Sequence, residues 1–479
     1  MSNKEKSLFD AFVRQGLGRR ELFDRAAKLG LGAAATGSLL NAMQSRALAA
    51  DYDWMANKGQ TLRLLLNKHP YADAMLQNLK HFEEMTGLKV TYDIFPEDVY
   101  FDKVTAALSS KSTQYDVFMT GAYQTWQYGP AGWLVDLNEF IKDSSKMAPN
   151  YDWEDILPNL RSSTAWSGKP GEPLGTANAK QWALPWGFEI NDVSYNKQIF
   201  DAQKIDPPKN LPDMIEKGAQ ISKNVPGVYG VGTRGSRSWA TIHAGYLSGF
   251  TNYGGHDFST DGGTLKPTMN SKEGKDFTKQ WVDMLHKAGP KNWTQYTWYE
   301  VANDLGSGTS GMIYDADIIG FFQQTGTKEA GHIGYEAFTP NPDAKAPTPN
   351  IWIWSLAMSA FSQKRDASWR FMQWASGTEQ LTFGATKANQ VDPVRQSVWK
   401  DPDFQSRLKA TYPGFLEEFQ GAAPGAKIYF TPQPLFFNVT TDWAAALQKM
   451  YAGQVSVDDG LDQLAANITQ QLSDAGITN

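Results

Sequence analysis

Apolar and polar positions alternate between two spacings in the part of the chain that follows residue 60. Residues 61–66 form a short, mainly apolar run that predicts a buried strand, and residues 72–85 space their apolar side chains as a helix does. Gly87 marks the end of that helix. The next predicted elements are a strand at 88–95, a helix at 98–108 and a strand at 115–119. This alternation predicts an α/β fold with a parallel sheet covered by helices.

The same alternation continues after a loop rich in Gly and Pro at residues 166–181. Residues 182–196 provide the first connection to this second unit. The predicted elements there are helices at 213–222, 239–250, 271–287 and 365–376, and strands at 229–233, 311–315 and 350–360. Ligands of such sheets bind beyond the carboxyl ends of the strands, which selects His69 and residues 121–126 as candidates.

Residues 1–49 differ from the rest of the chain and resemble a removable export signal. Basic residues precede a weakly apolar run at 29–42, and Ala47-Leu48-Ala49 supplies the small residues of a cleavage site. The pair Arg19-Arg20 resembles that of a twin-arginine signal. The alternative is an amphipathic N-terminal helix in which the arginine pair is accidental. Since no Cys follows the apolar run, we expect a soluble periplasmic protein without a lipid anchor.

Composition and charge exclude several classes of protein. The 479 residues contain no Cys, so disulfide scaffolds, Cys-ligated metal sites and Cys nucleophiles are excluded. A net charge of −6 disfavours a surface for nucleic acids. The length predicts two or three compact units rather than one. All 17 Trp lie beyond the export signal, so they are all part of the exported protein.

Motifs for catalysis or cofactor binding are weak in this sequence. Residues 230–235 match the G-x-G-x-x-G pattern of dinucleotide sites, but the glycines fall inside a predicted strand rather than between a strand and a helix. The six His residues show no metal-binding spacing, and no nucleophile elbow or phosphate loop occurs. We therefore expect a protein that is not an enzyme and uses no metal or cofactor. A pair of glycosidase carboxylates stays open, because sequence does not show their separation.

Aromatic residues gather near the predicted strand ends, beside side chains that form hydrogen bonds. Tyr123 precedes Gln124, and Phe188 precedes Glu189. Trp352 and Trp354 lie on one face of their strand, because side chains alternate between faces. Aromatic rings stack on the C–H faces of a polyhydroxyl ligand, while neighbouring polar groups bind its hydroxyls. The pattern indicates a neutral carbohydrate or polyol as the ligand.

Several segments of the mature chain follow, in the same order, the motifs of one known family. They are the strand that begins at Thr61, Phe82-Glu-Glu-Met-Thr-Gly-Leu-Lys-Val90, Ala131-Gly-Trp-Leu-Val-Asp-Leu137, residues 184–197, Arg234-Gly235 with Trp239, residues 311–317, residues 350–358 and Pro393-Val-Arg395. Together they resemble the extracellular solute-binding proteins of carbohydrate ABC importers, in the maltodextrin-binding superfamily and nearer to its polyol and monosaccharide branch. Tyr123-Gln124 replaces an acidic and basic pair of the maltodextrin binders, so their preference for oligosaccharides does not carry over.

The resemblance implies a type II periplasmic binding protein fold, in which two discontinuous α/β lobes close on a ligand in the cleft. It implies lobe 1 from residues 52–188 and 356–427, and lobe 2 from residues 189–355 and 428–479. It further implies the substrate-binding component of an ABC importer for a carbohydrate or polyol, with the membrane permease subunits as partners. We expect a monomer that has no nucleic acid as a partner.

The resemblance and the aromatic pattern together select the ligand-binding candidates. Trp186, Trp239 and Trp354 are expected to stack on the ligand. Hydrogen bonds are expected to be accepted by Glu189, Asp315 and Asp317 and donated by Gln124 and Arg234, and His69, Tyr123 and Trp352 complete the set. Two alternatives stay open, namely an exported carbohydrate-active hydrolase and a binding protein that holds an anionic sugar between Arg234 and Arg237.

Overall fold

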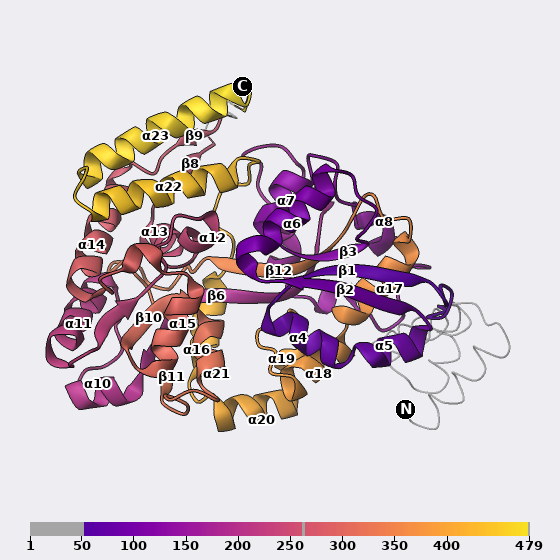
Figure 1. Ribbon diagram of the computed structural model, residues 1–479, viewed down its shortest axis with the longest axis horizontal. Coiled ribbons are helices and arrows are strands. Elements are labelled where there is room, and N and C mark those ends of the chain that lie inside the picture. Colours follow the sequence, from indigo (N-terminus) through magenta and orange to yellow (C-terminus); the bar gives the residue numbers. More distant parts are fainter. Residues whose placement is uncertain (1–51, 261–263, 478–479) are drawn as a thin grey trace, which may run out of the picture.

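Two α/β lobes lie side by side and share one continuous sheet (Figure 1). The computed structural model describes residues 52–260 and 264–477. The eight strands of the shared sheet are β1 Thr61–Asn67, β2 Lys89–Phe95, β3 Val117–Gly121, β6 Leu184–Asn196, β7 Tyr229–Gly232, β10 Ser310–Ala316, β11 Ile333–Glu336 and β12 Ile351–Met358. Their order is β2-β1-β3-β12-β6-β10-β7, with β11 paired to β6. The α/β class expected from the alternating pattern is confirmed.

The first lobe is built on the parallel strands β1, β2 and β3. The helix predicted over residues 72–85 is divided at Asn78 into α4 Pro70–Gln77 and α5 Leu79–Thr86. Asn78 leaves helical geometry there and its amide donates to Gln380 Oε1 at 2.8 Å. Gly87 ends α5 in the left-handed conformation that glycine adopts most readily, as predicted. Helix α6 Glu97–Ser109 leads into β3.

Two long strands join the lobes. The first part of β6 pairs with β12, and its second part pairs with β10 and β11 of the second lobe. On its other edge β12 pairs with β3 of the first lobe. At Gly187 of β6 a side chain would meet the Tyr71 ring, whose hydroxyl donates to the Phe188 carbonyl at 2.9 Å. The close packing of α4 on this strand therefore requires glycine.

The second lobe surrounds β7, β10 and β11 with helices. Strand β7 contains Gly230 and Gly232 of the G-x-G-x-x-G string, as predicted, whereas Gly235 lies beyond the strand, and the string does not open a helix. At Gly230 a Cβ would lie 2.1 Å from the carbonyl oxygen of Gly218 in a neighbouring helix. The glycine is there for strand–helix packing. Helices of this lobe are α10 Lys197–Gln203, α11 Leu211–Asn224, α12 Trp239–Ile242, α13 Ser248–Tyr253, α14 Lys272–Ala288, α15 Trp298–Ser307 and α16 Asp317–Gln323.

The remaining elements complete both lobes. Helices α17 Arg365–Ala375 and α18 Thr378–Lys387 lie beside the first lobe, whereas α22 Phe436–Tyr451 and α23 Val457–Asp474 lie on the second (Figure 1). The others are α7 Ala122–Tyr128, α8 Asn138–Ile141, α9 Pro158–Ser163, α19 Gln396–Trp399, α20 Pro402–Thr411, α21 Phe415–Ala422 and the short strands β4 Ala165–Trp166, β5 Lys180–Gln181, β8 Phe258–Ser259 and β9 Lys266–Pro267. The chain thus returns to each lobe, as the resemblance implied, while the exact lobe boundaries stay a prediction.

The predicted export signal at residues 1–49 lies outside the described residues. Within residues 52–260 and 264–477, no helix combines the length and the apolar character that a membrane span requires.

Candidate ligand-binding site

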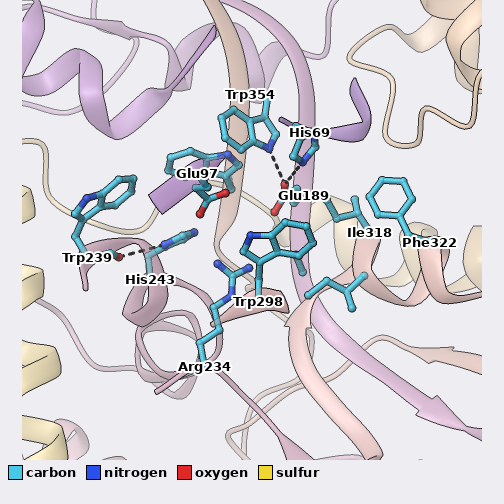
Figure 2. Close-up of a pocket in the computed structure, with 13 residues that line it drawn as sticks. His69, Glu97, Glu189, Arg234, Trp239, His243, Trp298, Ile318, Phe322 and Trp354 are labelled. Atoms are coloured by element: carbon cyan, nitrogen blue, oxygen red, sulfur yellow. Dashed lines mark hydrogen bonds and ion pairs between the residues drawn. The ribbon is translucent and has the colours of Figure 1, made fainter. Parts of the chain in front are cut away.

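A small cavity lies where the two joining strands meet both lobes (Figure 2). Its volume is about 30 Å³. The N-cap of α4 and side chains from α6, β6 and β12 form one side, and side chains from the second lobe form the other. The lining residues are His69, Glu97, Glu189, Arg234, Trp239, His243, Trp298, Ala316, Ile318, Ile319, Phe322, Trp352 and Trp354.

Glu189 is held in place by two side chains of the first-lobe side. Its Oε1 accepts a hydrogen bond from Trp354 Nε1 at 2.7 Å and lies 3.6 Å from His69 Nε2 (Figure 2). His69 caps helix α4 and accepts from the Tyr71 backbone N–H through Nδ1 at 3.2 Å. Because Nδ1 is the acceptor, the proton of a neutral His69 is on Nε2, facing Glu189. Both of these contacts are made to Oε1 of Glu189.

Aromatic rings cover the cavity on both sides. Trp352 and Trp354 lie on the same face of β12, as the period of two predicted, with ring centroids 5.2 Å apart. Phe101 of α6 stacks on Trp354 at 6.2 Å and contacts Trp239 of the second lobe at 5.0 Å. In this structure the two lobes therefore contact each other beside the cavity.

Arg234 is the cation of the cavity wall, and Asp315 balances its charge. Arg234 Nε donates to both carboxylate oxygens of Asp315 at 3.1 and 2.9 Å, and its Nη2 donates to Oδ1 at 2.7 Å. Nη1 also donates to the Ala240 carbonyl at 3.0 Å. Burial alone would lower the pKa of Arg234, but the charge and hydrogen bonds of Asp315 outweigh it and raise that pKa. A fixed, charged fork with N–H groups to spare can bind hydroxyls.

His243 contributes a neutral imidazole to the cavity. Burial, together with the nearby Arg234 charge, lowers the pKa of His243 to about 3. Its Nδ1 lies 3.4 Å from the Trp239 carbonyl oxygen, which can only accept, so Nδ1 carries the proton. Nε2 is then an acceptor, and Figure 2 shows it on the side of the ring away from that carbonyl.

The structure brings together six of the eleven candidates selected from the sequence. His69, Glu189, Arg234, Trp239, Trp352 and Trp354 line the cavity. Five others do not line it. Tyr123, Gln124, Trp186, Asp315 and Asp317 are all buried, outside the lining.

Each of these five has a structural environment of its own. The Tyr123 hydroxyl donates to the Ile351 carbonyl at 2.9 Å, and Gln124 lies behind Trp352 near Gly121. Trp186 packs against Tyr71 in the first lobe. Asp315 orients Arg234, and Asp317 accepts the backbone N–H groups of Ile190 and Ile318 at 3.0 and 2.8 Å. A direct contact of these five with the ligand stays a prediction.

Seven lining residues were missed by the sequence reasoning. They are Glu97, His243, Trp298, Ala316, Ile318, Ile319 and Phe322. Trp298 lies within a Thr-x-x-Glu capping box formed by Thr297 and Glu300, which is a recognisable helix start. Its position at the cavity depends on the packing of α15, which no local pattern shows.

Four carboxyl groups are buried behind the cavity. Burial raises the pKa values of Asp192, Asp317, Asp392 and Glu418 well above the ordinary range. Asp192 and Asp317 each accept two backbone N–H groups. Asp192 Oδ2, Asp317 Oδ2 and both oxygens of Asp392 and Glu418 are buried without a hydrogen-bond partner in the described part of the chain. Glu418 lies close to Asp192, and Asp392 lies close to Asp317, so burial beside another carboxyl favours the protonated form.

Metal binding finds no support in the described residues. Among residues 52–260 and 264–477, no group of three or more His, Asp or Glu side chains has a geometry that could hold a metal ion. The cavity offers hydrogen-bond acceptors, a fixed guanidinium and aromatic faces.

This fold and cavity define a two-lobed ligand-binding protein. A family model described as "Bacterial extracellular solute-binding protein" matches residues 68–382, and the chain belongs to this family. It is 40% identical over 438 residues to the erythritol/L-threitol-binding protein of Mycolicibacterium smegmatis, covering 91% of this chain and 90% of that one. The resemblance stated from the motifs is thereby confirmed.

Solved structures have the same fold. An ABC transporter solute-binding protein from Agrobacterium vitis with bound D-mannitol superposes with a TM-score of 0.72 at 25% identity, covering 87% of this chain and 99% of that one. Another from Agrobacterium radiobacter in complex with ribitol has a TM-score of 0.72 at 18% identity, covering 86% and 98%. The two-lobed fold expected from the resemblance is confirmed.

Proposed function

We propose that the protein binds a short, uncharged polyol between its lobes and delivers it to the membrane subunits of an ABC importer. Four-carbon polyols are the favoured class, because the relative with 40% identity is named for erythritol and L-threitol. The family and its relatives are binding proteins, and the proposed role includes no chemical change of the ligand.

The charge balance of the cavity is the observation that carries this proposal. Arg234 is already paired with Asp315, while the other charged lining side chains, Glu97 and Glu189, are carboxylates. An anionic sugar would face these carboxylates without a free counter-charge. A neutral ligand can instead donate its hydroxyl protons to them.

The alternative of an anionic sugar held by two arginines receives no support from the geometry. Arg237 is exposed and does not line the cavity. Arg234 therefore acts without a second guanidinium, and its fork is bound by Asp315 on one edge. Asp315 also neutralises the Arg234 charge that an anionic ligand would need.

The size of the cavity supports a small ligand. Its volume of about 30 Å³ corresponds to room for a few water molecules in the described arrangement. The rings of Trp239, Trp352 and Trp354 can stack on the C–H groups of a short carbon chain. A ligand that contacts both lobes stabilises their closed form, which is the form that an importer can recognise.

The export route is part of the proposal. The twin-arginine-like segment at residues 1–49 supports export to the periplasm, and the lack of Cys in the chain supports a protein without a lipid anchor. We propose that the protein acts there as a monomer that meets the permease subunits after it has closed on its ligand.

A ligand screen that compares uncharged polyols with a carboxylate of the same length tests the proposal. Erythritol, L-threitol, ribitol, D-mannitol and maltose are compared with erythronate, the carboxylate analogue of erythritol, by thermal shift and calorimetry. A tetritol present at 100 times its Kd should add about 2.7 kcal/mol to the free energy of unfolding. Binding of erythronate or maltose in preference to every polyol would contradict the proposal. Release of a product from a glycoside during prolonged incubation would instead support the hydrolase alternative.

A further inference from the structure

One buried polar atom of the cavity wall has no hydrogen-bond partner in the described part of the chain. Trp298 Nε1 is buried and unpaired, and among the described lining residues no other buried side-chain nitrogen or oxygen is in that state. Trp354 Nε1, by comparison, donates to Glu189. A buried N–H group without an acceptor is unfavourable. A ligand that supplies an acceptor at this place removes that cost, and it would bind more tightly than a ligand without one.

The start of helix α15 fixes the position of Trp298. Thr297 caps the helix, accepting from the Tyr299 backbone N–H at 3.3 Å, and Glu300 accepts from the Thr297 backbone N–H at 2.7 Å. The Trp298 ring packs on the Tyr299 ring with centroids 4.0 Å apart. The Tyr299 ring therefore covers one face of the indole, and the N–H edge of the indole faces the cavity (Figure 2).

Acceptors lie across the cavity from this N–H edge. Figure 2 shows the Trp298 nitrogen on the side of its ring that faces Arg234, Glu97 and His243, all of which line the same cavity. A hydroxyl group placed between them can accept from the indole and donate its own proton to a carboxylate or to His243 Nε2. A carboxylate ligand could accept but not donate, and an aliphatic group could do neither.

We propose that the indole N–H of Trp298 donates a hydrogen bond to one hydroxyl oxygen of the bound polyol and thereby selects ligands that carry this hydroxyl. The inference rests on the proposed function, since it requires a hydroxylated ligand in this cavity. Trp298 is thus a specificity-determining residue with a role different from Trp239, Trp352 and Trp354, whose rings supply apolar surface.

The test combines the variant Trp298→Phe with ligands that lack single hydroxyls. Phenylalanine keeps an aromatic ring at the helix start and removes the donor. Calorimetry measures the affinity of the wild type and the variant for erythritol and for the butanetriols, each of which lacks one of its hydroxyls. The variant should bind erythritol about three- to tenfold more weakly, and should bind one butanetriol as well as the wild type does.

Trp281→Phe is the matched control. Trp281 Nε1 is also buried without a partner, but this residue lies in α14 outside the cavity lining. The control should leave every ligand affinity unchanged, even where it lowers the thermal stability. A second readout is the indole signal of Trp298 in a spectrum of the ¹⁵N-Trp-labelled protein, assigned by its loss in Trp298→Phe. Erythritol should shift this signal and slow its exchange with solvent.

Three outcomes separate the possibilities. Wild-type affinity of Trp298→Phe for erythritol would overturn the proposed contact while leaving the polyol function intact. An equal loss for erythritol and all butanetriols would also overturn it, because the residue would then act only by packing. If the wild-type protein binds none of the polyols, the proposed function is contradicted, and the proposed Trp298 contact is contradicted as well.

Discussion

Two buried groups of ionisable side chains lie beside the cavity, and they are stabilised in different ways. Arg234 and Asp315 form an ion pair with the Arg234 side chain 5% and the Asp315 side chain 0% exposed. Asp192, Asp317, Asp392 and Glu418 form a group of buried carboxyls, and the described residues supply no hydrogen-bond donor to several of their oxygens. The first group is neutralised by opposite charge, the second by protons.

The difference lies in how each group responds to pH. Arg234 keeps its charge over the whole physiological range, because the charge and hydrogen bonds of Asp315 raise its pKa. Carboxyls with raised pKa values stay neutral only until the solution is alkaline enough to remove their protons. Residues 315 and 317 are separated by one residue, Ala316, which lines the cavity. Two modes of charge compensation thus meet at one strand end, directly behind the cavity.

The largest expected effect comes from breaking the ion pair. Asp315→Asn leaves the Arg234 charge buried without a counter-charge and should lower the free energy of unfolding by about 3–5 kcal/mol. Urea denaturation at neutral pH measures the change. The double variant Asp315→Asn with Arg234→Met removes the stranded charge and should regain part of the loss. If Asp315→Asn is as stable as the wild type, Asp315 is not the counter-charge that stabilises buried Arg234.

A smaller, pH-dependent effect is expected at the carboxyl group. Burial raises the folded-state pKa of Asp392, so the folded protein keeps a proton that the unfolded chain releases above about pH 4. This contribution to stability is complete at low pH and is lost as pH rises toward the folded pKa.

Asp392→Asn should remove that pH dependence. Asn tolerates the left-handed backbone of this residue, with φ of 47°, and carries no titrating proton. Between pH 5 and 8 the unfolding free energy of the wild type should fall relative to the variant by up to about 1.4 kcal/mol per pH unit. The exposed Asp343→Asn serves as a control and should follow the wild-type profile. Parallel profiles for the wild type and Asp392→Asn would refute the proton-based balance.

The smallest effect is expected for an exposed ion pair, because its charges are not buried and are already solvated by water. Lys287 and Asp283 are one helical turn apart in α14, at 2.7 Å, with side chains about half exposed. Lys287→Met should change the free energy of unfolding by no more than about 0.5 kcal/mol. Denaturation in low and high salt measures the contribution, which should disappear as salt screens the charges. A loss comparable to that of Asp315→Asn would remove the contrast between buried and exposed pairs.

Local pattern predicted most of the strands and several lining residues. The alternation of residues 350–360 placed Trp352 and Trp354 on one face, where both line the cavity. The glycines of residues 230–235 were assigned to a strand, and β7 contains two of them. These successes share a cause, because the period of side chains along a strand depends only on the nearest residues.

The other parts of the site depend on contacts between distant segments. Asp315 and Ala316 are neighbours in β10, yet Ala316 lines the cavity while Asp315 faces Arg234 from behind it. Which face of β10 meets the cleft is decided by its neighbours β6 and β7, not by its own residues. The same holds for Trp298 and His243, whose helices are positioned by tertiary packing.

The shared sheet also has a consequence for the order of synthesis. Strand β3 needs β12 as its neighbour, and the Tyr123 hydroxyl donates to the Ile351 carbonyl 228 residues further along the chain. A growing polypeptide therefore exposes an unpaired edge of the first lobe until most of the protein has been translated. Such non-local pairing slows folding and prolongs exposure to aggregation. Cells that produce this protein must keep its first lobe soluble while that edge waits for its partner strand.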